Sequence, residues 1–465
     1  MSKIKSLIGD KAFYKAVLAI AIPIMVQNGI TNFVSLLDNI MVGRLGTEQM
    51  SGVSIVNQFI FIFNLVLFGA AAGAGIFASQ FFGKGDNEGV RNSFRFKVIA
   101  NLFLALIGIV LFILLDDTLI NLFLHDGEST GDLALTLEYG KKYLYIMLFG
   151  LIPFAVSLAY ATTMRETGDT VMPMLASLAG VATNTLLNWV LIFGFLGAPA
   201  LGVRGAAIAT VISRVVEMST LIIYAHTHTK RFPYLVGALK LFKIPAALFL
   251  KITKKAIPIM ANEFFWSLAI TMRNQCYSTR GLDAVAAQNI SSTLINLSNV
   301  VYMAIGSAIG IIVGKMLGAG EVARAKDTAK KMIAFSMAAA TAIGVVLAGA
   351  AFVFPLIYNT SAAVKSLATY MMIIAAIAMP FSAFAFSVYF TLRSGGQVLV
   401  TIIFDSAFMW GVIIPVSAIL AYLTAIPIHL LFAICQLVEF VKLGLGLYLL
   451  KKVNWARQLD VVSDT

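Results

Sequence analysis

Ala21-Ile22-Pro23-Ile24-Met25 recurs as Ala256-Ile257-Pro258-Ile259-Met260, 235 residues further along the chain. The same offset then aligns about sixty positions without a gap, including Asn39 with Asn274, Gly46 with Gly281, Asn64 with Asn299, Gly83 with Gly318 and Gly85 with Gly320. A membrane chain built from two copies of one segment is typical of transporters, in which the substrate path runs between the copies. The repeat therefore predicts two related halves that alternate access by rocking.

The composition predicts a helical membrane protein. Of all residues, 60% are hydrophobic and 12% charged, and the mean hydropathy of +0.90 excludes an ordinary soluble domain. Apolar runs long enough to cross about 30 Å of hydrocarbon recur along the chain, and runs this apolar cannot be alternating barrel strands. We expect an all-α fold of twelve transmembrane helices in two six-helix lobes related by a pseudo-twofold repeat. The expected spans are 15–43, 51–81, 96–116, 138–164, 171–196, 202–225, 247–272, 284–316, 332–357, 366–392, 398–423 and 427–450.

The charge distribution predicts the orientation of the chain. Its net charge is +12, and 25 of its 34 lysines and arginines fall on one side of the twelve-span arrangement, opposite an acidic loop at 116–138. The positive-inside rule then predicts that both termini are cytoplasmic. The basic residues would contact anionic lipid rather than nucleic acid. Because the basic start is followed by an apolar stretch that is too long for a signal core, no cleavable signal peptide is expected.

The predicted organisation has three parts. An N-terminal six-helix lobe, 1–226, is followed by a basic cytoplasmic linker, 227–246, and by a C-terminal six-helix lobe with a short cytoplasmic tail, 247–465. The linker segment 234–245 fits a short amphipathic helix on the membrane surface and an ordered loop equally well.

Nothing in the sequence indicates an enzyme or a bound cofactor. Cys276 and Cys435 lie inside apolar spans, where packing explains them better than a disulfide or a metal site, and the four histidines show no metal-binding spacing. Since the sequence offers no phosphate-binding glycine loop, nucleophile triad or metal-ligand cluster, we expect neither ATP hydrolysis nor a resident metal.

Six motifs follow one another along the chain. They are Asp38-Asn39-Ile40-Met41-Val42-Gly43, Gly83-Lys84-Gly85, Arg165-Glu166-Thr167-Gly168-Asp169, Asn184-Thr185-Leu186-Leu187-Asn188, Gly202-Val203-Arg204-Gly205-Ala206-Ala207 and Arg393-Ser394-Gly395-Gly396. Their order and spacing resemble the multidrug and toxic compound extrusion (MATE) transporters over the whole chain, the duplication included, and are closest to the NorM-type bacterial branch. The resemblance implies a monomeric transport unit in the bacterial cell membrane that exchanges small organic cations for protons or sodium.

Polar residues inside the spans are the candidate site residues, because a charge in hydrocarbon costs several kcal/mol unless it is paired or hydrated. Asp38 lies 23 residues after Lys15, about 34 Å along a helix, and its position alone fits a coupling acid or an interfacial acid equally. Asn184 and Asn188 are one turn apart on one helical face, where structural hydrogen bonding is the alternative role. The resemblance makes Asp38 the coupling acid and places Asn184, Asn188 and Thr210 beside it, as a site for a proton or sodium.

The second half offers Glu263 as its intramembrane acid, although the repeat aligns it with Asn28. The resemblance implies that Glu263 belongs to a cation site. The tenth-helix aspartate of that branch is replaced by Ser382, and Asp405 in the eleventh helix is the candidate substitute. Arg273 aligns with Asp38, and either a pair with Asp405 or a side chain that extends to the interface would accommodate it.

Substrate contacts are expected at Asp38, Gln27, Asn28 and Glu263, whereas Glu217 and Glu439, at matching places in their halves, are expected to form structural pairs. Proton coupling is favoured over sodium, because a proton needs one carboxylate and the second-half acid pair is incomplete. Two alternatives in the same superfamily are a flippase of lipid-linked saccharides and an exporter of a specific metabolite.

Overall fold

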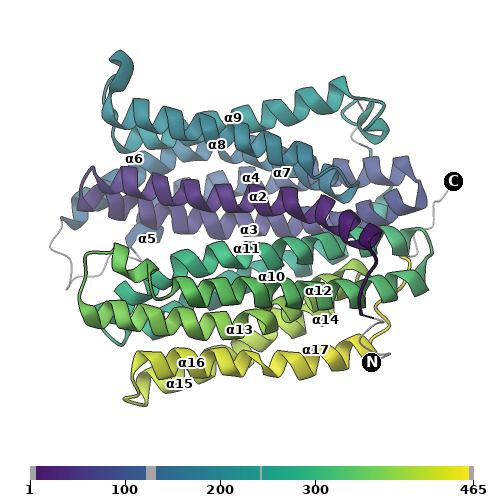
Figure 1. Cartoon of the computed structure of the whole chain (residues 1–465). Helices are drawn as coiled ribbons and strands as arrows, with labels where there is room; N and C mark the ends of the chain where they lie inside the picture. Colours follow the sequence, from purple (N-terminus) through teal and green to yellow (C-terminus); the bar gives the residue numbers. More distant parts are fainter. Residues whose placement is uncertain (1–6, 122–131, 241–242, 460–465) are drawn as a thin grey trace. The chain divides into compact units, whose positions relative to one another are not determined.

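The computed structural model describes residues 7–121, 132–240 and 243–459, which form helices joined by short connections (Figure 1). The described residues contain no strand. Helices of the first half are α2 (Lys11–Gly43), α3 (Thr47–Lys84), α4 (Asn87–Leu114), α5 (Asp116–Asn121), α6 (Leu133–Phe149), α7 (Leu151–Glu166), α8 (Val171–Phe193) and α9 (Val203–Thr227). Those of the second half are α10 (Ala246–Ser278), α11 (Leu282–Gly318), α12 (Val322–Ala350), α13 (Ala362–Ser394), α14 (Val398–Ile402), α15 (Ile414–Tyr422), α16 (Ile428–Glu439) and α17 (Val441–Lys452).

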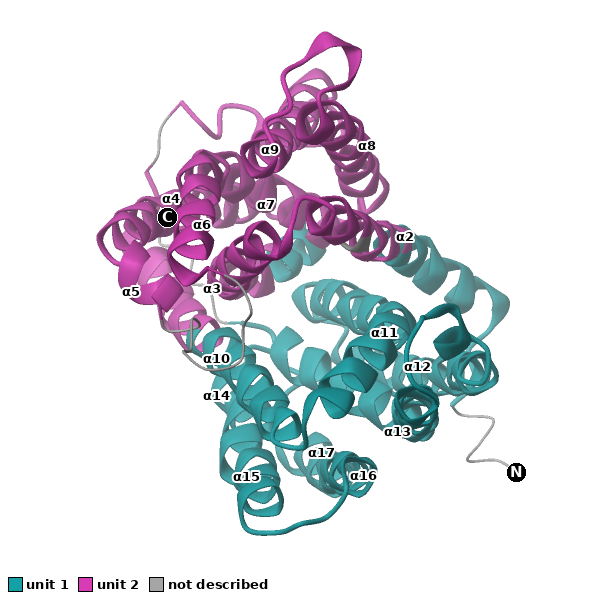
Figure 2. Cartoon of the chain, turned by 90° about the vertical axis from the view of Figure 1, so that its left-hand side faces the viewer, with its two compact units in different colours: residues 1–25, 79–85, 261–465 teal, residues 26–78, 86–260 magenta. Residues whose placement is uncertain are grey.

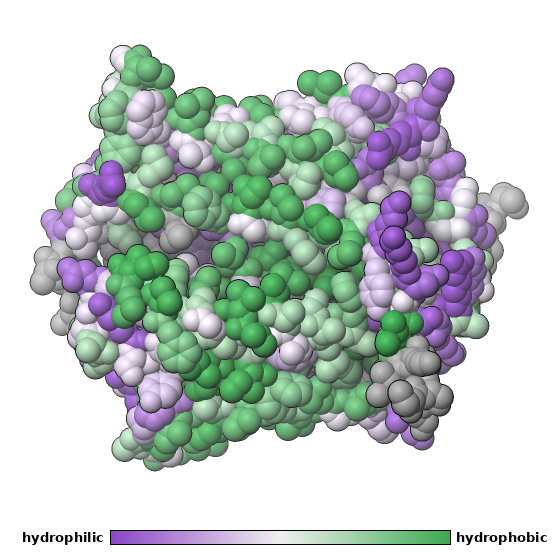
Figure 3. Space-filling view, viewed as in Figure 1, coloured by the Kyte–Doolittle hydropathy of each residue, from purple (hydrophilic) through white to green (hydrophobic). Residues whose placement is uncertain are grey.

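Ten of the described helices, counting 398–422 and 428–452 as one each, are long and apolar enough to cross a membrane, and the pair α6 and α7, bent by 46°, makes an eleventh. The one expected span that remains, the seventh in chain order, is α10, whose apolar stretch is interrupted by Asn262, Glu263 and Arg273. The all-α fold with twelve helices is therefore confirmed. On the face in Figure 3, apolar residues cover the middle of the helices and hydrophilic residues gather at their ends, as expected for helices in lipid.

Polar caps and helix breaks set the ends of several spans. The side chains of Asp86, Asp132 and Ser361 accept hydrogen bonds from the first-turn N–H groups of α4, α6 and α13, which satisfies donors that a helix leaves unpaired. The eleventh span is widened into two π-helices, η4 (Ile403–Ala407) and η5 (Met409–Ile413), between α14 and α15. Such widened turns occur frequently at functional sites.

The chain divides into two compact units whose boundaries cut through helices (Figure 2). Unit 1 contains residues 1–25, 79–85 and 261–465, and unit 2 contains residues 26–78 and 86–260. Met25 in α2 and Met260 in α10, where the boundary falls, are equivalent positions of the repeat. Each first helix of a repeat therefore divides two residues after its proline and contributes one part to each unit.

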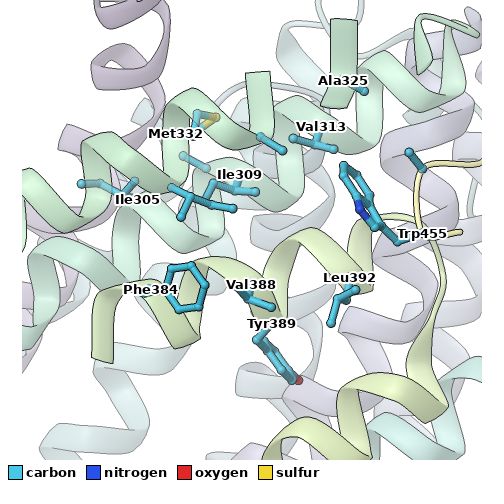
Figure 4. Packing of buried hydrophobic residues seen from close by; sticks show 14 of the residues in the cluster. Ile305, Ile309, Val313, Ala325, Met332, Phe384, Val388, Tyr389, Leu392 and Trp455 are labelled. Carbon is cyan, nitrogen blue, oxygen red and sulfur yellow. The ribbon is translucent and has the colours of Figure 1, made fainter. Parts of the chain in front are cut away.

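Each unit has its own hydrophobic core. In unit 1, side chains of α11, α12 and α13 pack with Phe404, Leu449 and Trp455 of the C-terminal segment (Figure 4). In unit 2, the core joins α2, α3, α4, α6, α7, α8 and α9 around Val56, Ala105 and Leu151. Helices packed this closely position the polar side chains described below.

A reciprocal contact within unit 1 follows the repeat. A Cβ atom on Gly83, at the end of α3, would lie 2.0 Å from the carbonyl oxygen of Lys315 in α11. A Cβ atom on Gly318 would lie 1.9 Å from the carbonyl oxygen of Gln80. Gly318 is the repeat equivalent of Gly83, and Lys315 is the repeat equivalent of Gln80. The repeat therefore relates the two contacts to each other. Only glycine permits helices to approach so closely.

The linker is an ordered loop that packs on unit 2, with a short 3₁₀ turn, η2 (Pro233–Leu235). Tyr234 is buried, its hydroxyl lies 2.7 Å from Thr167 Oγ1, and its carbonyl oxygen accepts from Arg91 Nε at 3.1 Å. Arg95 Nε donates to the carbonyl oxygen of Ala238 at 2.9 Å. Of the two alternatives for 234–245, the ordered loop is correct for the described part; Leu241 and Phe242 lie outside the described residues.

The acidic loop predicted at 116–138 is described only at its two ends, and Asp126 and Glu128 lie outside the described residues. Asp116, in α5, accepts a hydrogen bond from the Tyr145 hydroxyl and lies 3.2 Å from Lys141 Nζ. Burial opposes ionisation of Asp116, but the hydrogen bonds from Tyr145 and the Asp117 backbone, together with Lys141, outweigh it and lower the pKa of this carboxyl.

Candidate functional site

The first-half acid and the three polar residues expected beside it lie together in unit 2. Asp38, on α2, accepts a hydrogen bond at its Oδ1 from Asn188 Nδ2 of α8 at 2.6 Å. Asn188 Nδ2 also lies 3.1 Å from Asn184 Oδ1, one turn earlier on the same helix. Asn184 in turn lies 3.2 Å from the hydroxyl of Thr210 on α9. Three helices therefore bring one carboxylate, two amides and a hydroxyl into a continuous hydrogen-bonded cluster.

The amide of Asn184 satisfies its neighbours best when its oxygen faces Thr210. Its Nδ2 then donates to Asp38 Oδ2 at 3.0 Å, and its Oδ1 accepts from Thr210 Oγ1 at 3.2 Å. Asp38 would then accept from both asparagines. Among the described residues, Asn188 Oδ1 is buried and accepts no hydrogen bond, which leaves one free oxygen beside the carboxylate. An oxygen in that state is a suitable ligand for a small cation such as Na⁺.

No ion pair to Asp38 is formed by the residues that the structure describes. Its fixed partners are amides, which stabilise a carboxylate without neutralising its charge. Tyr143, on α6, lies close enough to interact with both Asp38 and Thr210, and its hydroxyl donates to Asn57 Oδ1 of α3 at 3.1 Å. Neither Tyr143 nor Asn57 was predicted as a site residue, although each is a polar residue in an apolar run.

The other two expected substrate residues of the first half lie elsewhere on α2. Gln27 is eleven residues before Asp38, about 16 Å along a helix. Its Oε1 accepts a hydrogen bond from Arg165 Nη2 at 2.5 Å, and it lines a small recess between α2 and α8 with Met174 and Ser177. Asn28 is partly buried next to it. The structure therefore does not bring Gln27 and Asn28 into the Asp38 cluster.

In unit 1, Glu263 of α10 lies beside an arginine. Glu263 Oε1 accepts from the Tyr389 hydroxyl at 3.1 Å and lies 3.8 Å from Arg393 Nη1. The same guanidinium nitrogen donates to the Tyr389 hydroxyl at 3.3 Å. Because Tyr389 and Arg393 are one turn apart on α13, one helical face presents both groups to the carboxylate.

Asp405 is also paired, although with a residue that was not predicted. Its Oδ1 lies 3.4 Å from Nζ of Lys442 on α17, and its Oδ2 accepts from Asn262 Nδ2 at 3.1 Å. The charges of Asp405 and Glu263 interact, so the structure brings the two predicted acids of the second half together. Lys442 was missed because it lies inside an apolar run and could have been found as the single lysine in the middle of the twelfth span.

Both arrangements proposed for Arg273 are wrong. Its Nη1 lies 2.8 Å from Glu439 Oε1 of α16, so that it neither pairs with Asp405 nor extends alone to the interface. This contact gives Glu439 the structural partner that was expected for it. Glu217, its counterpart in the first half, is partly buried, and its charge interacts with the guanidinium groups of Arg214 and Arg165. In each half, the glutamate of the last span thus interacts with an arginine.

A second buried lysine lies in unit 2. Lys97 is one of the 25 basic residues that the charge distribution assigns to the cytoplasmic side. It is nevertheless fully buried in α4, donates to Thr163 Oγ1 at 3.0 Å and forms an ion pair with Glu166 of α7. The described residues hold no group of three or more histidine, cysteine, aspartate or glutamate side chains arranged for a metal ion. Cys276 and Cys435 are buried and unbridged.

Comparison with known proteins gives the family. The model of the MatE family matches residues 23–190 and 258–432, one segment in each half. A probable multidrug resistance protein NorM of Thermotoga maritima is 26% identical over 351 residues, 73% of this chain and 70% of its own. Its namesake in Neisseria meningitidis serogroup B is 25% identical over 414 residues, 87% of this chain and 86% of its own.

The fold has counterparts among solved structures. A crystal structure of MATE in complex with MaL6 superposes with a TM-score of 0.84 at 19% identity and covers 96% of this chain and 97% of that one. The curated relatives carry the NorM name that the motifs indicated. Because the family model matches well over half of the chain, in both repeats, the chain belongs to the MatE family and is a NorM-type membrane transporter, not an enzyme.

Proposed function

We propose that this protein is an ion-coupled antiporter that exports cationic amphiphilic drugs or toxic compounds, with Asp38 as the residue that exchanges the coupling ion for the substrate. One observation carries the proposal. Asp38 is held by two asparagine amides, and no described residue pairs with its charge. A carboxylate in a membrane helix that lacks a cation partner needs a mobile one.

The exchange follows from the charge of one group. When Asp38 is ionised it attracts a cationic substrate, and when it is protonated or bound to sodium it does not. A substrate and an ion that compete for the same carboxylate cannot occupy it together, so each promotes release of the other across a two-state transporter. The relatives named as multidrug resistance proteins support a substrate class of organic compounds rather than one metabolite.

The coupling ion that we propose is the proton. In unit 1, Glu263 and Asp405 already face Arg393 and Lys442. Only Asp38 is left as an acid without an internal cation among the expected site residues, and a single carboxylate suffices for a proton. Sodium remains the alternative, because Asn188 Oδ1 and Asp38 together offer oxygen ligands. We propose that Asp38 is the substrate contact that carries the charge, and we keep Gln27, Asn28 and Glu263 as further proposed substrate contacts.

The proposal also covers the lobe boundaries, the orientation in the membrane and the oligomeric state. We propose that the lobes are 1–226 and 247–465, that both termini face the cytoplasm of a bacterial cell, and that a monomer is the transport unit. The positive-inside distribution supports the orientation. The linker, which packs on unit 2 through Tyr234 and Ala238, would then lie on the cytoplasmic side.

The test is transport by purified protein in liposomes. An outward-directed gradient of ethidium, as the cationic probe, should be discharged faster when an inward proton gradient is imposed, and Asp38→Asn should abolish the acceleration. Asp283→Asn, which removes an exposed acid outside the candidate sites, is the matched control. Equal acceleration in the Asp38→Asn variant would overturn the proposal.

A further inference from the structure

Lys442 is placed where a lysine is costly. It lies near the middle of the twelfth span, 428–452, and is 8% exposed. A charged side chain at the centre of a membrane helix is energetically costly, and such residues usually mark functional sites. The mechanism proposed above makes no use of this ammonium group.

The ammonium group lies between a carboxylate and two aromatic rings. Nζ of Lys442 is 3.4 Å from Asp405 Oδ1, and it lies 5.7 Å from the ring centroid of Phe404 and 5.4 Å from that of Phe408. Aromatic faces within about 6 Å attract cations, and sites lined by such faces recognise organic ammonium groups. We name these three residues, Phe404, Asp405 and Phe408, the aromatic carboxylate site.

The site is held in place independently of Lys442. Asn262 Nδ2 donates to Asp405 Oδ2 at 3.1 Å, which fixes the carboxylate and leaves Oδ1 for the ammonium group. Ser406 Oγ donates to the carbonyl oxygen and to Oδ1 of Asn262, at 2.8 and 2.6 Å. Asp405 lies on the widened turn η4. With the bond from the Ser406 backbone N–H to Asn262 Oδ1 at 3.4 Å, four hydrogen bonds that do not involve the lysine connect α10 and η4.

The contact between Lys442 and Asp405 is longer than the hydrogen bond from Asn262 that holds Asp405 in place. It follows the break at Phe440 between α16 and α17, and the 3.4 Å contact with Asp405 is longer than a normal charge-assisted hydrogen bond. A four-carbon stem at the start of a helix can withdraw from the site without disturbing the bonds between Asn262, Asp405 and Ser406. The bonds that hold Asp405 in place are therefore independent of the side chain that occupies the site.

We propose that Phe404, Asp405 and Phe408 form a binding site for an organic ammonium group, and that Lys442 fills this site when no ligand is bound. The ligand class is a primary or substituted alkylammonium, because the occupant that the site holds is itself one. Binding is independent of the export proposed at Asp38; only the consequence that a substrate must displace Lys442 rests on the proposed function.

Chemical rescue tests the inference with purified, full-length protein. Lys442→Ala removes three methylene groups and the ammonium group, which n-propylammonium replaces atom for atom. The variant should show a lower Tm than the wild type, and n-propylammonium should raise it saturably, by about half of the loss or more, as expected for a ligand that binds only the folded state. The wild type, whose site is filled, should show no such rise.

Three controls separate binding from general effects. 1-Propanol, which has nearly the same volume and no charge, should not rescue. The double variant Lys442→Ala with Asp405→Asn should not respond to n-propylammonium. Lys315→Ala is the matched control, because Lys315 is a partly buried lysine of unit 1 that lies 4.8 Å from the ring centroid of Phe82, but it forms no described ion pair, and its variant should not respond.

If Lys442→Ala cannot be purified alone, the yield of monodisperse protein after extraction in n-propylammonium becomes the measurement. An increase in that yield that requires Asp405 supports the site. Equal responses of the single and double variants, equal rescue by 1-propanol, or no rescue at any concentration of n-propylammonium would overturn it. The behaviour of Asp38→Asn enters none of these outcomes, so failure here leaves the proposed export intact.

Discussion

The two units contain acids in the same kind of helix but give them opposite partners. In unit 2, Asp38 lies among Asn184, Asn188 and Thr210 and has no described cation beside it. In unit 1, Glu263 lies beside Arg393, and Asp405 lies beside Lys442. A carboxylate that has an internal counter-charge does not need a mobile ion, whereas one that has only amides does. The partner, not the presence of an acid in a span, indicates where ion exchange takes place.

The repeat shows that the difference between the units extends to one equivalent position, where the two halves carry opposite charges. Asp38 aligns with Arg273 across the offset of 235 residues. In unit 2 this position holds the unpaired acid, and in unit 1 it holds an arginine bonded to Glu439. In the second half, the same position therefore belongs to a structural ion pair, and the acids of that half, Glu263 and Asp405, lie at other positions.

The largest effect is expected from Asp38→Asn. Asparagine keeps the shape of the side chain and removes the exchangeable charge, so resistance of cells that express the variant should fall to the level of cells without the transporter. Glu263→Gln, by contrast, should retain measurable resistance, because Arg393 already balances that acid. Minimal inhibitory concentrations, normalised to protein in the membrane, provide the measurement. A Glu263→Gln variant as inactive as Asp38→Asn would break the comparison between the units.

The second effect concerns the driving ion. With one exchangeable carboxylate, an inward proton gradient should drive substrate exchange in liposomes, and an inward sodium gradient without a pH gradient should drive little. Initial rates with and without a protonophore distinguish the two. Strong sodium-driven exchange that persists with the protonophore would assign Asn188 Oδ1 and Asp38 to sodium instead.

A smaller effect is expected from Asn188→Ala. The lost hydrogen bond, 2.6 Å long and made to a charged group, belongs to a class worth roughly 1.5–3 kcal/mol. The pH at which half of the proton-driven rate is reached should therefore move by about one to two units, since 1.4 kcal/mol is about one pH unit. Removal of a partner of the ionised form favours protonation, so the midpoint should move up. Ser406→Ala, which breaks a bond in unit 1, should leave the midpoint unchanged.

The sequence predicted the architecture well, because hydrophobic runs and a repeat are local and periodic signals. The twelve apolar runs are all helical, although some are broken into two helices. The family resemblance implied that Asn184, Asn188 and Thr210 lie beside Asp38, and the structure has them in one hydrogen-bonded cluster. Helix ends extend beyond the apolar runs, as in α3 and α11, because a helix continues into water where the hydrophobic pattern stops.

Partners across helices could not be predicted in the same way. Nothing in the order of residues shows that Arg273 faces Glu439 or that Lys442 faces Asp405, because those pairs are 166 and 37 residues apart and depend on how helices rotate about their axes. Gln27 illustrates the reverse case. It shares α2 with Asp38 and is nevertheless about 16 Å away along the helix.

The smallest effect is expected from the Arg273–Glu439 ion pair of unit 1, which we interpret as structural. Arg273 and Glu439 are 20% and 24% exposed, so removal of one partner should destabilise the protein by roughly 1–3 kcal/mol, below the loss that fully buried pairs show. Arg273→Met and Glu439→Met should each lower Tm, and the double variant should recover part of the loss because no uncompensated charge remains. Proton-driven transport per folded molecule should stay the same in all three. If the double variant is as unstable as the sum of the single ones, the pair contributes no coupling energy, and Arg273 must act through another group.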